Sequence, residues 1–181
     1  MTEPSVPARR NIELKARVAS LDAAREICKQ FAALSAIERQ TDTYFHCGQG
    51  RLKLRERDGL PTQLVGYARP DAVTPRASDY WLVPVAEPAL LKAALVATLG
   101  TLVVVEKERE VFLYRNVRIH LDRVVDLGEF VEFEAVMSPA DNEEQAADLV
   151  AELAQRLGVR TSDRIEYSYS DLLLVKRRGK G

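Results

Sequence analysis

Polar and apolar residues alternate along much of this chain. Over residues 10–18, Leu14 and Ala16 share one face, while Glu13 and Lys15 belong to the other. Alternation with a period of two is typical of a β-strand. Similar segments predict further strands over residues 40–47, 50–57, 64–69, 78–85, 101–110, 111–124, 129–137 and 164–170.

Three other segments place apolar residues at the spacing of one helix face. The first is capped by Asp22, and its stripe consists of Ala24, Ile27, Phe31 and Leu34. The second runs from Pro88 to Gly100, with a stripe of Leu91, Ala94, Leu95 and Leu99. The third begins at Ser138-Pro139 and ends at Gly158, with a stripe of Ala146, Leu149, Val150, Leu153 and Leu157. We expect all three stripes to face the core.

About eight strands with short turns, such as Asp58-Gly59 and Leu127-Gly128, favour an antiparallel sheet. The sequence therefore predicts an α+β fold in which an eight-stranded antiparallel β-barrel has a polar interior and helices packed outside. An open sheet with one charged face in water is the alternative. We expect one domain over residues 1–181 with a core of about 9–175, and mobile ends at Met1–Ala8 and Lys176–Gly181.

Composition restricts the class of protein. The 181 residues include 26 lysines and arginines and 27 aspartates and glutamates, for a net charge of −1, which points to no nucleic-acid or membrane partner. Two cysteines, Cys28 and Cys47, are too few for a disulfide framework or a zinc quartet. The start lacks the apolar segment of a signal peptide, and no apolar run approaches a membrane span. The sequence therefore predicts a cytoplasmic protein of undetermined oligomeric state.

The polar faces of the predicted strands carry many charges. The cations are Lys15, Lys53, Arg55, Arg69, Lys107, Arg109 and Arg118, and the acids include Glu13, Asp122, Glu132 and Glu134. Burying so many cations around a lumen requires an anion, and a polyphosphate suits both arginine and lysine. The clustered carboxylates suit Mg²⁺ or Mn²⁺. A solvated face with cross-strand ion pairs is the simpler alternative, in which His120 is only a hydrogen-bonding neighbour.

Several of these segments, taken in order from about residue 10 to 174, resemble one family. Asn11-Ile12-Glu13-Leu14-Lys15 resembles the E-x-E-x-K signature of the CYTH superfamily, the triphosphate tunnel metalloenzymes. Similarity to its class IV adenylate cyclase branch continues at residues 40–45, 51–56, 76–80, 107–109, 118–122, 127–134 and 168–173, the last of which resembles the family's closing strand. The resemblance implies an eight-stranded tunnel that binds a triphosphate-bearing small molecule with a divalent metal.

The resemblance also implies roles for the charged residues. Glu13 and Lys15 are the expected catalytic residues, and Asn11 stands where the signature has its first Glu, which makes Glu13 the principal acid of that strand. The phosphates would be bound by Lys15, Lys53, Arg55, Arg69, Lys107, Arg109 and Arg118, and Mg²⁺ or Mn²⁺ by Glu13, Asp122, Glu132 and Glu134.

The preferred activity is that of a class IV-like adenylate cyclase, which converts ATP to cyclic AMP and pyrophosphate. One alternative is a triphosphatase that hydrolyses inorganic tripolyphosphate, thiamine triphosphate or a nucleoside triphosphate. The other alternative is a non-catalytic triphosphate-binding protein.

Overall fold

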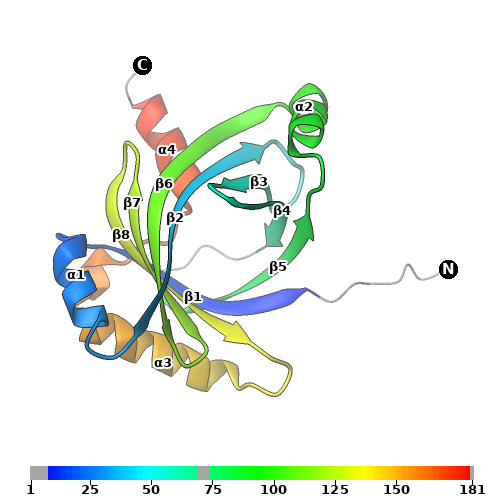
Figure 1. Ribbon diagram of the computed structural model, residues 1–181. Helices are drawn as coiled ribbons and strands as arrows, with labels where there is room; N and C mark the ends of the chain where they lie inside the picture. Colours follow the sequence, from blue (N-terminus) through cyan, green and yellow to red (C-terminus); the bar gives the residue numbers. More distant parts are fainter. Residues whose placement is uncertain (1–7, 69–73, 180–181) are drawn as a thin grey trace.

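The computed structural model describes residues 8–68 and 74–179 (Figure 1). The strands are β1 (Arg9–Arg17), β2 (Ala33–Phe45), β3 (Arg51–Arg57), β4 (Leu60–Ala68), β5 (Arg76–Pro84), β6 (Thr101–Tyr114), β7 (Val117–Val124) and β8 (Gly128–Met137). The helices are α1 (Leu21–Cys28), α2 (Pro88–Leu99), α3 (Glu143–Arg156) and α4 (Tyr169–Arg178), with a short 3₁₀ turn at Thr161–Asp163.

The strands close into an antiparallel barrel in the order β1-β5-β4-β3-β2-β6-β7-β8. Closure joins the first strand to the last, with Glu13 opposite Glu134 and Lys15 opposite Glu132. Because successive side chains point to opposite faces of a strand, one face of each strand lines the lumen and the other faces outward. The predicted eight-stranded α+β barrel is confirmed, and the alternative of an open sheet is wrong.

The main apolar core lies outside the barrel wall rather than inside it. Helices α1 and α3 pack against the outward faces of β1, β7 and β8, as the lower part of Figure 1 shows. Leu14, Phe133 and Leu153 are almost fully buried in this layer. Burial of the alternate apolar residues on these strands fixes their register, because a shift of one residue would turn every charged side chain into the core.

A second, smaller core closes one end of the barrel. Helix α4 packs against β6, and its Tyr169 and Leu173 join Val103, Val105 and Phe130 in one apolar cluster. The rings of Phe130 and Tyr169 meet edge to face, with their centroids 5.0 Å apart. This cluster brings Tyr169, the first residue of α4, against the charged lumen.

The strand predicted over 164–170 is wrong. Only an isolated bridge between Ala16 and Arg164 forms there, and the chain then enters α4. Ser168 and Asp171 cap this helix reciprocally: Ser168 Oγ accepts from the Asp171 N–H at 3.2 Å, and Asp171 Oδ2 accepts from the Ser168 N–H at 3.0 Å. This capping box favours a helix over the alternation of tyrosine and serine.

The predictions for the chain ends meet the structure only in part. Residues 176–178, expected in a mobile tail, belong to α4. Residues 1–7 and 180–181 lie outside the described part of the chain, so their predicted mobility is not addressed there.

Several predicted boundaries also differ from the structure. β6 continues to Tyr114, past the predicted break at residue 110, and the chain turns at Arg115, whose φ is 53°. Ser20, rather than Asp22, caps α1, and Asn142 caps α3, four residues after the predicted start. In each case the residue that caps the helix is the one whose side-chain oxygen reaches a free backbone N–H.

Two predicted helix stripes do not form as expected. Helix α1 ends at Cys28, and Leu34, the last residue of its predicted stripe, lies on β2 and is 50% exposed. The stripe of α2 does not form a core, because none of the side chains of this helix is buried. No helix among the described residues has the length and apolar character needed to cross a membrane.

We expect Leu173→Ala to lower the free energy of unfolding by about 2–5 kcal/mol, because Leu173 is buried against the barrel end. Val175→Ala, on the same helix but 68% exposed, is the matched control and should change it by less than about 0.5 kcal/mol. Urea unfolding of both variants measures the difference. Equal losses in the two variants would contradict the packing of α4 described above.

Candidate functional site

The barrel encloses a cavity of about 510 Å³. Its lining, among the residues that the structure describes, includes eight cations and four carboxylates: Arg9, Lys15, Lys53, Arg55, Arg57, Lys107, Arg109 and Arg118, with Glu13, Glu38, Glu132 and Glu134. Charged side chains lose their hydration when they are buried, so they require a counter-charge or hydrogen-bonding partners. The contacts within the wall show where these partners lie.

Asp42, on β2, is the partner of three cations. Its carboxylate accepts from Lys53 Nζ at 2.8 Å and from Arg55 Nε and Nη2 at 2.9 and 3.1 Å, and it lies 3.5 Å from Lys107 Nζ. Burial alone would raise the pKa of Asp42, but Arg55, Lys53 and Lys107 hold it well below the usual range. One buried carboxylate therefore serves three cations, and positive charge is in excess on this wall.

A second group of charges joins β6, β7 and β8. Arg109 donates two hydrogen bonds to Asp122, both 2.6 Å long, and a third to Glu132 at 2.7 Å. Tyr169 Oη donates to Asp122 Oδ2 at 2.7 Å. Although burial opposes ionisation of Asp122, Arg109 lowers its pKa to about 2. Asp122 thereby fixes the guanidinium of Arg109.

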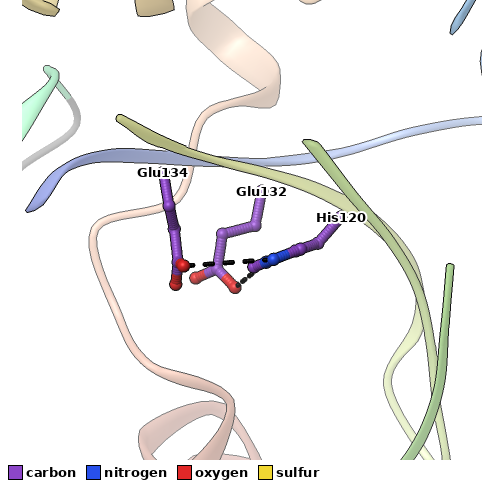
Figure 2. A group of neighbouring side chains, drawn as sticks. All are labelled: His120, Glu132 and Glu134. Carbon is purple, nitrogen blue, oxygen red and sulfur yellow. Dashed lines mark hydrogen bonds and ion pairs between the residues drawn. The ribbon is translucent and has the colours of Figure 1, made fainter. Parts of the chain in front are cut away.

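Three potential metal ligands lie close together in the lumen (Figure 2). His120 comes from β7, and Glu132 and Glu134 come from β8, with one ligand atom of each within 4.8 Å of the others. Nδ1 of His120 is 3.5 Å from Oε2 of Glu132, and its Nε2 is 3.9 Å from Oε2 of Glu134. Glu132 also forms an ion pair with Lys15 at 2.7 Å, whereas Glu134, among the cations that the structure describes, has only a longer contact with Arg118. Glu134 is therefore the less tightly paired of the two carboxylates.

Glu13 lies beside this cluster, since it is opposite Glu134 in the β1–β8 ladder. It is 8% exposed and its Oε1 is 3.5 Å from Arg76 Nη2. Carboxylate oxygens from adjacent strands are ligands that fit a hard divalent cation such as Mg²⁺ or Mn²⁺, whereas the imidazole of His120 is a softer donor. The residues present therefore fit the metal that the sequence analysis predicts.

Most of the predicted site residues meet in this lumen. Lys15, Lys53, Arg55, Lys107, Arg109, Arg118, Glu13, Glu132 and Glu134 all line the cavity. Asp122 is fully buried behind Arg109, with both carboxylate oxygens hydrogen-bonded. Arg69 lies outside the described residues. The catalytic, phosphate-binding and metal-binding roles assigned to these residues stay predictions.

Roles for Asp42, Arg76 and Tyr169 do not follow from the sequence pattern. Segment 40–47 is polar on both faces, so alternation does not indicate which face turns inward. The position of Tyr169 depends on α4, which begins where the alternation of residues predicts a strand. Asp42 is two residues from Gln40 and from Tyr44, which line the cavity, so the period of two places all three on one face of β2.

The lumen lowers the pKa of the buried Lys107 side chain. Burial, assisted by Arg109 and opposed by Asp42 and Asp122, lowers its pKa to about 7, and Arg55 also faces it with positive charge. Between pH 7 and its ordinary pKa, the unfolded chain holds a proton that the folded protein has released. The free energy of unfolding should therefore rise with pH across this range.

We expect the wild type to gain about 2 kcal/mol of unfolding free energy between pH 7 and pH 9 relative to Lys107→Met, because only the wild type carries this titration. Lys92→Met, which removes a partly exposed lysine on α2, is the matched control. Urea unfolding at both values of pH measures the effect. Parallel pH profiles for the wild type and Lys107→Met would show that the pKa of Lys107 is not lowered.

Comparison with known proteins gives the same picture of the fold. The family model for the CYTH domain matches residues 9–169. A comparison with curated proteins finds no match. Among solved structures, the PH1012 protein from Pyrococcus horikoshii OT3 is 23% identical with a TM-score of 0.76, and the alignment covers 90% of this chain and 98% of that one.

Two further structures resemble the chain. A proposed adenylate cyclase from Vibrio parahaemolyticus is 22% identical with a TM-score of 0.71, and covers 92% of this chain and 98% of its own. HpAC1 from Hippeastrum, a proposed adenylyl cyclase with a dominant triphosphatase activity, is 13% identical with a TM-score of 0.64, over 93% of this chain and 95% of its own. The similarity to these solved structures concerns the fold alone. Because the family model spans most of the sequence, the chain belongs to the CYTH domain family.

Proposed function

We propose that this protein is a divalent-metal-dependent enzyme that cleaves a triphosphate compound inside the barrel. The observation that carries the proposal is the distribution of charge in the lumen. Three cations share the single carboxylate of Asp42 on one wall, and Glu13, Glu132 and Glu134 gather on another. A triphosphate with a divalent metal supplies the charge that each wall lacks.

The phosphate oxygens would be bound first by the cations around Asp42. Lys53, Arg55 and Lys107 converge on this carboxylate, so they are already held close together before an anion arrives. Arg109, held by Asp122, and Lys15 and Arg118 extend the positive lining across the lumen. Such preorganised cations would stabilise the charge that develops on the leaving phosphates. Arg69 is included from its predicted role alone.

Glu13, Glu132 and Glu134 would hold the metal, with His120 beside them. A divalent cation there would polarise the phosphoryl group and neutralise part of its charge. The hydrogen bonds of Asp122 favour a positioning role toward Arg109 over the predicted role of metal ligand. Asn11, which replaces the first Glu of the signature, also lines the cavity and offers a neutral oxygen in place of a carboxylate.

Cyclisation of ATP to cyclic AMP and pyrophosphate is the first candidate reaction, because the sequence resembles the class IV adenylate cyclase branch. In that reaction the ribose 3′-hydroxyl attacks the α-phosphorus and pyrophosphate leaves, and Glu13 and Lys15, which line the cavity, are the proposed catalytic residues. Hydrolysis by water is the second candidate, and the triphosphatase activity of the related fold from Hippeastrum favours it. Both reactions depend on positioning and electrostatics that the same residues supply.

The two reactions differ in their products. The protein should be incubated with ATP, inorganic tripolyphosphate and thiamine triphosphate, each with Mg²⁺ or Mn²⁺, and the products followed by phosphorus NMR. Cyclic AMP with pyrophosphate identifies a cyclase, and release of orthophosphate identifies a triphosphatase. Binding without any metal-dependent product would replace the proposed enzyme with a triphosphate-binding protein.

We expect the double substitution Glu132→Gln with Glu134→Gln to abolish metal-dependent turnover, because a hard cation requires carboxylate charge. Glu132 also pairs with Lys15 and Arg109, so Glu134→Gln alone serves as the milder variant and should raise the metal concentration needed for activity. Glu152→Gln, an exposed position on α3, is the control. Circular dichroism checks the fold, and wild-type metal dependence in Glu134→Gln would remove this residue from the metal site.

A further inference from the structure

The side chain of Tyr169 reaches from α4 into the charged lumen. It lines the cavity, and its ring lies against two of the cations there. Nζ of Lys15 is 3.9 Å from the ring centroid, and Nζ of Lys107 is 5.3 Å from it. An ammonium group within about 6 Å of an aromatic centroid is attracted by the negative face of the ring. The ring therefore acts on cations from two different strands, β1 and β6.

The hydroxyl of the same side chain acts on a third cation through a carboxylate. Tyr169 Oη donates to Oδ2 of Asp122, which also accepts from Nη2 of Arg109 at 2.6 Å. Burial and the charge of Asp122 raise the pKa of Tyr169 well above its ordinary value, so the hydroxyl keeps the proton that it donates. The hydroxyl thus holds the carboxylate oxygen on which one branch of the Arg109 guanidinium rests.

The surroundings of Tyr169 hold its ring in place. Phe130 packs edge to face against it, and the capping box of Ser168 and Asp171 sets the start of α4 immediately before it. Asp171 Oδ2 also accepts from Nη2 of Arg51 on β3 at 2.8 Å, which ties the first turn of α4 to the barrel wall. A side chain whose rotamer is locked by packing and by hydrogen bonds on its own element can support other side chains precisely.

An aromatic ring holds a cation without neutralising it, unlike a carboxylate. Glu132 is the ion-pair partner of Lys15, but it is also a proposed metal ligand, so a bound metal would share its charge. The ring of Tyr169 carries no net charge, and it leaves the charge of Lys15 available to a phosphate. A lysine stem is flexible, and an ammonium group that is held beforehand loses less freedom when an anion binds.

Resting on the proposed function, we infer that Tyr169 is a positioning residue for the cations of the lumen. Its ring holds Lys15, and its hydroxyl holds Arg109 through Asp122, so that both cations are in place when a polyphosphate binds. This role is separate from the packing of α4 against the barrel end. Leu173 belongs to the same apolar cluster as Tyr169 but is not part of the cavity lining, so the two roles can be tested apart.

Isothermal titration with inorganic tripolyphosphate and Mg²⁺ tests the inference on binding alone. Tyr169→Phe keeps the ring and loses only the hydroxyl, so it should weaken binding about threefold. Tyr169→Leu removes the ring and the hydroxyl, and it should weaken binding about thirtyfold. Circular dichroism selects a temperature at which every variant is folded.

Two variants serve as controls for the titration. Leu173→Ala loosens the packing of α4 without removing the ring, and Tyr114→Phe removes a hydroxyl outside the lumen, where the ring of Tyr114 meets Phe31 edge to face. Both should bind tripolyphosphate within about twofold of the wild type.

Proton NMR gives a readout of the ring contact that does not depend on binding. The ring current of Tyr169 should shift the Hε protons of Lys15 upfield in the wild type, in Tyr169→Phe and in Leu173→Ala. The shift should disappear in Tyr169→Leu. A purely structural contribution of Tyr169 to the barrel end predicts no such pattern.

Equal tripolyphosphate affinities in Tyr169→Leu and Leu173→Ala would overturn the inference, because packing of α4 would then account for the whole effect. Wild-type affinity in Tyr169→Phe would overturn the role of the hydroxyl, even if Tyr169→Leu does not fold, and an unshifted Lys15 in the wild type would overturn the role of the ring. In each case the proposed function would stand if the wild type binds tripolyphosphate and Arg55→Ala weakens this binding. If the wild type does not bind it, the proposed function and the inference both fail.

Discussion

The cost of burying cations is the constraint on which this structure depends. Lys15, Lys53 and Arg109 are each less than 10% exposed, and ionised side chains lose most of their hydration at such burial. Asp42, Asp122 and Glu132 compensate part of this loss through short ion pairs. The compensation is incomplete, and the remaining positive charge gives the lumen its affinity for an anion in the proposed function.

Apolar packing on the outside of the barrel stabilises the fold and allows a charged interior. Burial of the alternate apolar faces of β1, β7 and β8 under α1 and α3 provides stabilisation of the usual hydrophobic kind. Because the pleat couples the two faces of each strand, that packing also determines which charges point inward. Helix α4 also connects the apolar packing to the charged lumen. Its Tyr169 belongs to the apolar cluster at the barrel end and donates a hydrogen bond to Asp122, which in turn accepts from Arg109. The stability of the fold and the placement of the charged side chains therefore depend on the same strands and helices.

The sequence predicts most of the strands and most of the charged residues of the lumen, because polar and apolar residues alternate along it with a period of two. Lys107 and Arg109, or Glu132 and Glu134, are two residues apart, and a period of two places such pairs on one face of a strand. The helix at 169–178 could not be predicted in the same way, because a local capping box between Ser168 and Asp171 overrode the alternation. The inward orientation of Asp42 could not be predicted from alternation, because both faces of its strand are polar. The contact between Lys15 and the ring of Tyr169 joins β1 to α4 and becomes visible only in three dimensions.

A thermal shift series tests the central claim, that the lumen binds a triphosphate through its excess of buried cations. Orthophosphate, pyrophosphate and an organic or inorganic triphosphate should be compared with Mg²⁺ at fixed ionic strength. At about 100 times its dissociation constant, a ligand of the folded state adds roughly 2.7 kcal/mol to the unfolding free energy. We predict the largest rise in Tm for a triphosphate and little for orthophosphate, with the rise reduced in Arg55→Ala. Equal shifts for mono-, di- and triphosphate would show non-specific anion binding and contradict the account.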